Sequence, residues 1–303
     1  MSARRDSLEL MIYSTIISPI ELAQRLSDDD WLVVDTRFSL GDPERGRTEY
    51  LEAHISGAVY AHLDDDLSGQ IIEGKSGRHP LPSIGDMEAT FSSMGIADGI
   101  QVVAYDDAGG GTAARLWWML HFLGHDAAAV LDGGWPHWVR AGLPTRSGSE
   151  RNPPRPFSAQ PRSDWIVNAD QVEDVRTRED WRIIDARAPE RFRGDMEPID
   201  PVAGHIPGAV SAPYSENLDT HGTFLQPEDL RRHFENVLGD TAGDCVVSYC
   251  GSGVTAAHNL LALVHAGLGH GRLYPGSWSE WITDPKRPVE KDGTHSLGSA
   301  IPP

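Results

Sequence analysis

The chain has 303 residues, of which 39% are hydrophobic and 23% charged, and its 26 Lys and Arg against 45 Asp and Glu give a formal net charge of −19. Length and composition favour a globular protein of two domains over one. The negative charge argues against nucleic acid or membrane as a partner, because both require a net basic surface, and an anionic substrate would need a local positive site.

The N-terminal stretch 1–18 contains basic residues and a short, interrupted apolar run without a small-residue cleavage site. We interpret it as an unstructured start followed by an opening strand. Ser18 and Glu21 then form a capping-box pattern that predicts the start of the first helix, and Asn168 and Gln171 predict a helix start of the same kind later in the chain. No stretch is long and apolar enough to predict a transmembrane span.

Two halves of the chain repeat the same motifs at an offset of roughly 145 to 150 residues. The matching pairs are WLVVDTR (31–37) with WRIIDAR (181–187), AHISGAV (53–59) with GHIPGAV (204–210), VVAY (102–105) with VVSY (246–249), and LDGGWPHW (131–138) with YPGSWSEW (274–281). Each half alternates β-branched runs with helical segments, which is typical of an open, mainly parallel sheet covered by helices on both faces. We therefore predict an α/β protein with tandem domains at 8–146 and 163–288, joined by a Pro-rich linker at 147–162.

The repeat separates architecture from chemistry, because a feature found in both halves is expected to be architectural. Asp35 with Arg37, like the equivalent pair in the second half, is predicted to form an ion pair at a strand end. The halves differ at Cys250, whose counterpart in the first half is Asp106. A carboxylate cannot replace a thiol nucleophile, so we predict that the first domain is catalytically inactive and the second is catalytic.

Cys250 follows a strand-like run and precedes an apolar helical run that starts at about Thr255. The loop between them contains Gly251, Ser252, Gly253 and Val254, and its glycines allow successive N–H groups to point at the sulfur. Such a nest, backed by the positive end of the helix dipole, favours a thiolate and could hold a second sulfur on the cysteine. We expect Cys250 to be the nucleophile and residues 251–255 to cradle a persulfide.

The only other cysteine is Cys245, which we place inside the preceding strand as a buried structural residue. An extended strand would hold the two Cα atoms too far apart for a relaxed disulfide. A free, working thiol suits a reducing compartment, so we expect a cytoplasmic protein. Two cysteines without clustered histidines do not predict a metal site.

The segment Cys250–Ala256, Cys-Gly-Ser-Gly-Val-Thr-Ala, resembles the active-site loop of the rhodanese superfamily. Within it, the loop is similar to that of 3-mercaptopyruvate sulfurtransferases, because thiosulfate sulfurtransferases usually carry basic residues where Gly251 and Ser252 stand. The resemblance implies transfer of a sulfane sulfur through a Cys250 persulfide, from a small anionic donor to cyanide or to a thiol such as thioredoxin or a low-molecular-weight thiol, without a cofactor.

Three alternative functions are considered beside this one. A thiosulfate:cyanide sulfurtransferase would use the same persulfide. A non-catalytic sulfur-carrier or regulatory module is a second alternative, against which the intact cysteine loop argues. A dual-specificity phosphatase is disfavoured, because its loop is one residue longer and ends in an arginine, where this chain has Thr255 and Ala256.

The donor's anionic end requires a cation. Arg191 matches the arginine that binds this end in the family, and Arg193 is a second candidate, although both could be surface residues paired with nearby carboxylates. Mercaptopyruvate enzymes usually have a further arginine where this chain has Asp200, which is more similar to the thiosulfate enzymes. The sequence therefore leaves the donor undecided.

In some mercaptopyruvate enzymes the loop serine is joined by an aspartate and a histidine from the first domain. The resemblance places this relay at Ser252, Asp64 and His79. Alternatively, Asp64 belongs to a solvated acidic face and His79 is a loop histidine before a proline. A relay across the domains would explain why an inactive domain is kept.

Overall fold

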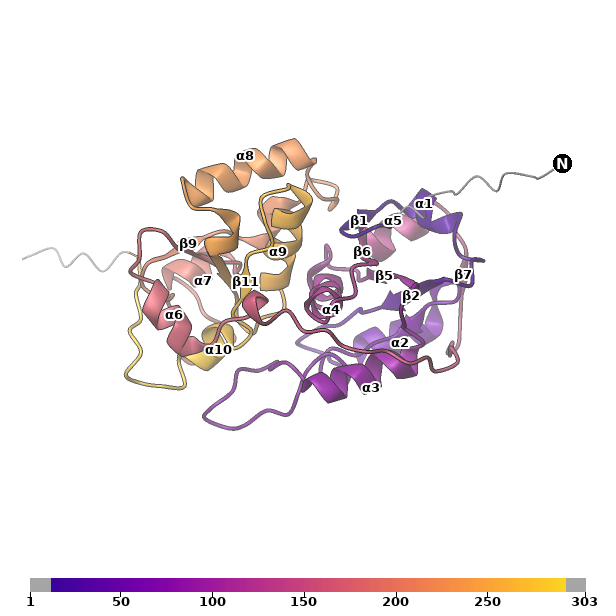
Figure 1. Ribbon diagram of the computed structural model, residues 1–303, viewed down its shortest axis with the longest axis horizontal. Helices are drawn as coiled ribbons and strands as arrows, with labels where there is room; N and C mark the ends of the chain where they lie inside the picture. The colour runs from indigo at the N-terminus through magenta and orange to yellow at the C-terminus, as the bar shows by residue number, and fades with distance from the viewer. Residues whose placement is uncertain (1–11, 293–303) are drawn as a thin grey trace, which may run out of the picture.

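The computed structural model describes residues 12–292 and contains two α/β domains that lie side by side (Figure 1). The first domain has a five-stranded sheet in the order β1-β6-β5-β2-β4, and all of its neighbouring strands are parallel. Its elements are β1 (Ile16–Ile17), α1 (Pro19–Ala23), β2 (Trp31–Asp35), α2 (Arg45–Glu52), β4 (Val59–Tyr60), α3 (Ile84–Met94), β5 (Gln101–Tyr105), α4 (Gly111–Phe122), β6 (Ala128–Leu131) and α5 (Gly134–Arg140), with a separate antiparallel pair, β3 (His54–Ile55) and β7 (Thr145–Arg146).

The second domain has a four-stranded parallel sheet in the order β11-β10-β8-β9. Its elements are α6 (Ala169–Val175), β8 (Arg182–Asp185), α7 (Pro189–Arg193), β9 (Ala209–Ser211), α8 (Pro227–Leu238), β10 (Val246–Tyr249), α9 (Ala256–His265), β11 (Arg272–Leu273) and α10 (Ser277–Trp281), with 3₁₀ turns at Ser163–Trp165, Tyr214–Asn217 and Gly243–Cys245. Both capping boxes predicted from the sequence are present, at Ser18 and at Asn168.

Both faces of each sheet are buried. In β5, Val102 and Ala104 belong to one apolar cluster while Val103 and Tyr105 belong to another, as the alternation of side chains along a strand requires. The second sheet divides in the same way, since Val246 and Val247 of β10 lie in different clusters. The predicted α/β class with sheets covered on both faces is therefore confirmed.

Equivalent hydrogen bonds in the two domains show that Asp106 and Cys250 occupy the same place. The carbonyl oxygen of Asp106 accepts from the N–H of Trp135 at 2.9 Å, and that of Cys250 accepts from Trp278 at 3.0 Å. Each residue directly follows an inner strand of its sheet, β5 in the first and β10 in the second. The strand-end ion pairs also recur, with a distance of 2.7 Å in the first domain and 2.6 Å in the second.

The domains are joined by continuous packing. α4 of the first domain lies against α9 of the second, and residues of both helices belong to one apolar cluster that extends across the interface. The segment between the domains follows the surface of the first, where Arg155 N–H donates to the Ser92 carbonyl at 3.0 Å and Ala159 N–H donates to Glu88 at 2.8 Å. Loops at the carboxyl ends of the two sheets can therefore meet at the interface.

The position of Cys245 differs from the one expected from the sequence, and the expected start of the chain lies largely outside the described residues. Cys245 lies in a 3₁₀ turn before β10 and is only partly buried, because the strand begins at Val246; the sequence had placed it inside the strand. The expected unstructured start falls largely on residues 1–11, which lie outside the described part of the chain. Within residues 12–292, none of the helices has the length and apolar character that a membrane crossing requires.

Candidate active site

Cys250 lies at the carboxyl end of β10, where the chain turns into α9. The residue is 2% exposed and both cysteines are free thiols. Its N–H donates to Ser277 Oγ at 3.0 Å, and the N–H of Gly253 donates to its Sγ at 3.1 Å. Gly253 has a φ of +77°, and a Cβ there would lie 2.3 Å from the carbonyl oxygen of Pro275, so this loop conformation requires glycine.

The matching loop in the first domain shows what such a loop can hold. The carboxylate of Asp106 accepts four backbone N–H groups, those of Ala108, Gly110, Thr112 and Ala113, at 2.8–3.0 Å, and also the Thr112 hydroxyl at 3.0 Å. These donors form an anion nest that the protein fills with its own side chain. The Cys250 loop occupies the equivalent place in the second domain, and one of its amides, that of Gly253, donates to the sulfur.

A cavity of about 410 Å³ opens above Cys250 between the two domains. Its lining includes most of the thiol loop, namely Cys250, Gly251, Ser252, Val254 and Thr255. Gly253, which donates its N–H to the sulfur, does not line the cavity. The first domain contributes the apolar Phe38 and Leu63, the second contributes Tyr214, and charged side chains come from both domains. The cavity therefore joins a thiol, apolar walls and guanidinium groups.

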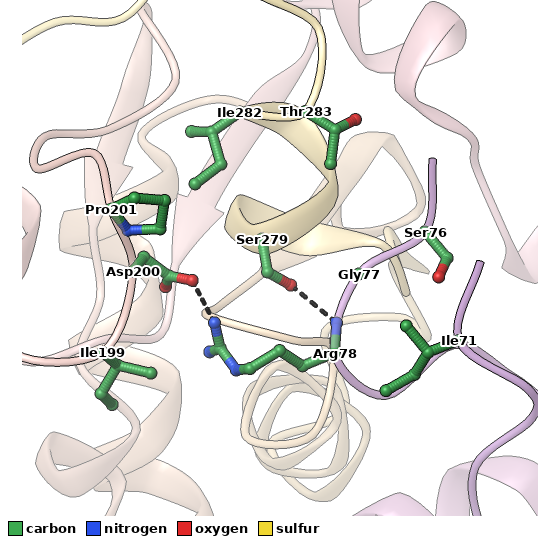
Figure 2. A pocket seen from close by; sticks show the side chains of 10 residues that line it. All are labelled: Ile71, Ser76, Gly77, Arg78, Ile199, Asp200, Pro201, Ser279, Ile282 and Thr283. Atoms are coloured by element: carbon green, nitrogen blue, oxygen red, sulfur yellow. Dashed lines mark hydrogen bonds and ion pairs between the residues drawn. The ribbon is translucent and has the colours of Figure 1, made fainter. Parts of the chain in front are cut away.

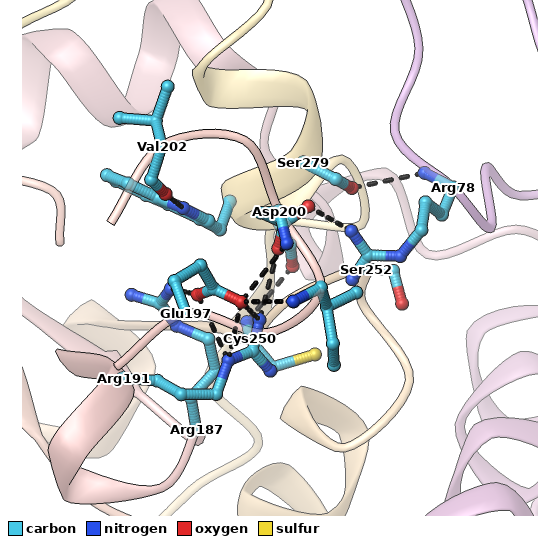
Figure 3. A network of polar contacts seen from close by, with 12 residues as sticks. Arg78, Arg187, Arg191, Glu197, Asp200, Val202, Cys250, Ser252 and Ser279 are labelled. Atoms are coloured by element: carbon cyan, nitrogen blue, oxygen red, sulfur yellow. Dashed lines mark hydrogen bonds and ion pairs between the residues drawn. The ribbon is translucent and has the colours of Figure 1, made fainter. Parts of the chain in front are cut away.

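Arg191 of α7 lines this cavity and is held in place by carboxylates (Figure 3). Its Nε donates to both carboxylate oxygens of Glu197 at 3.0 Å, and its Nη2 donates to Asp200 at 3.1 Å. Its side chain is 14% exposed. These contacts fix the guanidinium close to the thiol loop.

Arg193, the second predicted donor-binding residue, does not join this group. Its side chain is 45% exposed, donates to Asp195 at 2.7 Å, and is not among the residues that line the cavity. Residues two apart on a helix point in nearly opposite directions, so only one of the two arginines can face the thiol. The structure therefore leaves Arg193 out of the site.

A cation that the sequence analysis did not single out, Arg78, also lines the cavity. It lies on a loop of the first domain and forms an ion pair with Asp200 of the second (Figure 3). Asp200 thus accepts from guanidinium groups of both domains, Arg78 and Arg191. The acidic residue that counted against mercaptopyruvate in the sequence is therefore paired with two guanidinium groups in the fold.

The three predicted relay residues lie together. Ser252 Oγ is 2.7 Å from His79 Nδ1, and His79 Nε2 is 3.2 Å from a carboxylate oxygen of Asp64. Burial, and then the charges of Arg115 and Arg78, lower the pKa of His79 to about 3, so its ring is neutral at physiological pH. A neutral ring that donates from Nε2 to Asp64 has Nδ1 available to accept the Ser252 hydroxyl hydrogen.

Arg115 is a second cation that sequence reasoning missed. It lies on α4, is fully buried, and donates to the carbonyl oxygens of Gly253, Leu67 and His79 at 3.1–3.2 Å. Its Nε has no hydrogen-bond partner. Burial lowers its pKa to about 10, and its Coulomb interaction with Cys250 acts in the opposite direction. A lone arginine in the apolar run of α4 was the available signal, because buried arginines are rare unless paired.

Among residues 12–292, no group of three or more histidine, cysteine or acidic side chains is arranged to hold a metal ion. The polar atoms around Cys250 are instead backbone amides, a hydroxyl, an imidazole and guanidinium groups. This set suits an anionic organic substrate.

The comparison with known proteins divides the chain into the same two halves as the sequence repeat. Residues 18–141 and 168–284 each match the family model described as "Rhodanese-like domain". A Pseudomonas aeruginosa protein named "Probable 3-mercaptopyruvate sulfurtransferase" is 47% identical over 280 residues, which cover 92% of this chain and 99% of the relative. A Mycobacterium tuberculosis relative, named as a thiosulfate sulfurtransferase, is 40% identical over 283 residues, or 90% of this chain and 96% of its own. The solved structure of the 3-mercaptopyruvate sulfurtransferase from Leishmania major is similar with a TM-score of 0.78 and 33% identity, covering 88% of this chain and 74% of that one.

Proposed function

This chain belongs to the rhodanese family, and we propose that it is a sulfurtransferase that moves a sulfane sulfur from 3-mercaptopyruvate to a thiol or to cyanide through a Cys250 persulfide. Its fold is two rhodanese-like domains in tandem, as the sequence predicted. The first domain carries Asp106 where the second carries the thiol, so the chemistry belongs to the second.

The observation that carries the proposal is the loop at Cys250, where a thiol that accepts a backbone N–H lies at a cavity between the two domains. The Asp106 loop supports this assignment, because four amides and a hydroxyl there hold a carboxylate without any cation. A persulfide is also an anion, and the amides of the Cys250 loop could hold its outer sulfur in the same way.

The first step forms a bond between Cys250 Sγ and the donor sulfur and breaks the donor's C–S bond. The bonding electrons leave with C3 of the donor, and a proton on C3 completes pyruvate. The donor's thiol hydrogen balances this proton, so the net reaction converts a Cys250 thiolate and 3-mercaptopyruvate into a persulfide anion and pyruvate. The reaction therefore needs a group that accepts a proton from sulfur and returns it to carbon.

Ser252 and His79 supply that group in our proposal. The Ser252 oxygen receives the thiol proton as its own hydrogen passes to His79 Nδ1, while Asp64 stabilises the charged ring. The reverse transfers protonate C3. Arg191 binds the donor's carboxylate.

In the second step an acceptor thiolate or cyanide attacks the outer sulfur and regenerates the Cys250 thiolate. The acceptor would be a thiol such as thioredoxin or a low-molecular-weight thiol, and the two steps would give ping-pong kinetics. We place the activity in the cytoplasm, because the cycle needs Cys250 as a free thiol and a reducing compartment maintains it.

Thiosulfate is the second candidate donor. The name of the Mycobacterium tuberculosis relative and the acidic Asp200 favour it. Its terminal sulfur would pass to Cys250 with release of sulfite. A tenfold difference in kcat/KM between the two donors, or about 1.4 kcal/mol, measured on one preparation with cyanide as acceptor, would identify the better substrate.

The proposal predicts that Cys250 gains the mass of one sulfur atom when the enzyme meets a donor without acceptor. Cys250→Ser should lose both the mass gain and turnover while keeping its circular dichroism spectrum. Cys245→Ser should keep both the mass gain and turnover. An unchanged mass in the native protein with either donor would favour a non-catalytic module. Turnover by the Cys250→Ser variant would contradict the proposal.

A further inference from the structure

We propose that Arg78, a residue of the inactive domain, binds the donor together with Arg191, so that guanidinium groups from both domains grip the carboxylate of a short 2-oxo acid. The inference rests on the proposed function, since it specifies what recognises the donor at the same site. Asp200 then serves as the shared counter-ion that aligns the two arginines.

The loop that carries Arg78 is built to reach the second domain (Figure 2). The N–H of Arg78 donates to Ser279 Oγ of α10 at 3.1 Å. Gly77 makes this approach possible, because a Cβ there would lie 2.5 Å from the carbonyl oxygen of Gly276. Arg78 is therefore anchored at its backbone on the domain that contains Cys250.

The two guanidinium groups converge beside the thiol loop. A Cβ placed on Gly251 would lie 2.8 Å from Nη2 of Arg78 and 3.6 Å from both Nη atoms of Arg191. Gly251 directly follows Cys250, and all of these residues line the same cavity. A 3-mercaptopyruvate whose sulfur reaches Sγ has its carboxylate carbon three bonds away, which would bring the carboxylate within reach of both arginines.

Part of the hydrogen-bonding capacity of Arg78 is unused. Its ion pair with Asp200 uses Nη1, whereas Nη2 is the atom nearest Gly251. Its Nε is buried and has no hydrogen-bond partner. An incoming oxygen anion would therefore be bound by Nη2, which lies beside Gly251 and takes no part in the ion pair with Asp200.

Asp200 has the contacts of a positioning residue. Its two carboxylate oxygens accept from Arg78 and Arg191 respectively, and its own N–H donates to Glu197 at 3.1 Å. Its side chain is 2% exposed. The carboxylate fixes both guanidinium groups, but its charge also competes with that of the donor.

The two donors differ in shape, so they should depend on Arg78 to different degrees. A 2-oxo acid presents a planar carboxylate that two guanidinium groups can bind with charge-assisted hydrogen bonds. Thiosulfate presents a compact sulfonate next to the transferred sulfur and does not extend as far. The loss of Arg78 should therefore weaken the binding of 3-mercaptopyruvate more than the binding of thiosulfate.

The test compares steady-state kinetics of Arg78→Ala and Asp200→Asn with both donors. Arg78→Ala should raise the KM for 3-mercaptopyruvate by about tenfold or more, the loss expected for a hydrogen bond to a charged group, with little change in the KM for cyanide. Asp200→Asn should also raise the donor KM, because it keeps only one of the two acceptor oxygens and turns an amide NH2 toward the other guanidinium, which then loses its alignment. Arg193→Ala, whose arginine lies outside the cavity, is the matched control and should leave the donor KM unchanged.

A purely structural ion pair predicts a different pattern. If Arg78 only joins the domains, Arg78→Ala and Asp200→Asn would reduce kcat and stability alike and leave donor preference unchanged, and that result overturns the inference. Arg78→Lys provides a second variant that keeps the charge without the guanidinium fork, and an intermediate KM supports donor binding. Persulfide mass on native Cys250 separates the two proposals: its absence contradicts the function, whereas its presence with an unchanged KM in Arg78→Ala contradicts only this inference.

Discussion

Single side chains between the domains set the protonation states of the proposed site. His79 is buried, and burial together with the nearby charges of Arg115 and Arg78 lowers its pKa to about 3. A pKa this low makes the ring a weak base that holds a relayed proton only transiently, but the ring is uncharged from about pH 4 upward and can accept the Ser252 hydrogen bond throughout the physiological range. An ordinary histidine would lose this capacity below a pH of about 6.5.

We therefore expect no acid limb from His79 between pH 5 and pH 8 in the dependence of kcat on pH. His79→Asn and Ser252→Ala should each lower kcat for 3-mercaptopyruvate by about 100-fold or more, as expected for loss of general acid–base catalysis. The double variant should be no slower than either single variant, because the two side chains act as one relay. Full kcat in either single variant, or additive losses in the double variant, would argue against the relay.

The two arginines of α7 show which features of single residues the sequence can predict and which it cannot. Arg191 was the first candidate through the family resemblance and Arg193 the second, but the residues alone do not separate them, since both follow the same strand and both have acidic neighbours. The choice between them depends on the phase of a five-residue helix, which begins at Pro189. A helix this short has no apolar repeat from which the phase could be read.

At the scale of elements, the two strand–loop–helix units differ in what fills their nests. In the first unit, between β5 and α4, the Asp106 carboxylate occupies the nest. In the second, between β10 and α9, Cys250 Sγ accepts one amide, that of Gly253. The sequence could predict both units because a strand, a glycine-rich loop and an apolar helix are local patterns.

Contacts between elements of different domains could not be predicted in this way. Arg78 directly precedes the predicted relay residue His79, yet its partners Ser279 and Asp200 are far away along the chain. Arg115 is likewise placed by the packing of α4 against α9. Such contacts depend on how the domains dock, and the period of apolar residues within one element carries no information about docking.

The position of Arg115 on α4 leads to a prediction about the reactivity of the thiol. Arg115→Met keeps much of the side-chain volume but removes the buried charge near Cys250. Alkylation of Cys250 by iodoacetamide at pH 7 should slow by about tenfold, the change that 1.4 kcal/mol of lost stabilisation of the anion would cause. Arg115→Lys should retain a larger part of the rate. Unchanged alkylation in a folded Arg115→Met variant would show that the loop amides alone stabilise the thiolate.

At the scale of the whole molecule, the inactive domain contributes directly to the proposed site. Asp64, Arg78, His79 and Arg115 all come from it, while the second domain supplies Cys250 and its loop. Neither half contains a complete site, so the domain interface is part of the chemistry. Conditions that weaken the interface should therefore weaken both stability and activity.

His258 of α9 is a titratable group at this interface. Its Nε2 lies 3.0 Å from the carbonyl oxygen of Gly109 in the first domain, its Nδ1 lies 3.2 Å from the Asn217 amide nitrogen, and its ring stacks on Phe224. Burial lowers its pKa to about 4. Between about pH 4 and pH 6.5 the unfolded chain therefore binds a proton at this histidine that the folded protein does not bind.

Because the unfolded state binds more protons in this window, the free energy of unfolding should fall as the pH falls from 6.5 toward 4. His258 alone would contribute a loss of about 2 kcal/mol between pH 6.5 and pH 5, and His79, with a pKa of about 3, should act in the same direction. His258→Gln removes one titrating group while keeping an N–H donor for Gly109 and an acceptor for Asn217. Thermal unfolding of the two proteins from pH 7.5 to pH 4.5 should therefore give a smaller decrease in Tm for the variant. Parallel curves would mean that His258 binds a proton as readily in the folded protein as in the unfolded chain, and they would contradict its neutral role at the interface.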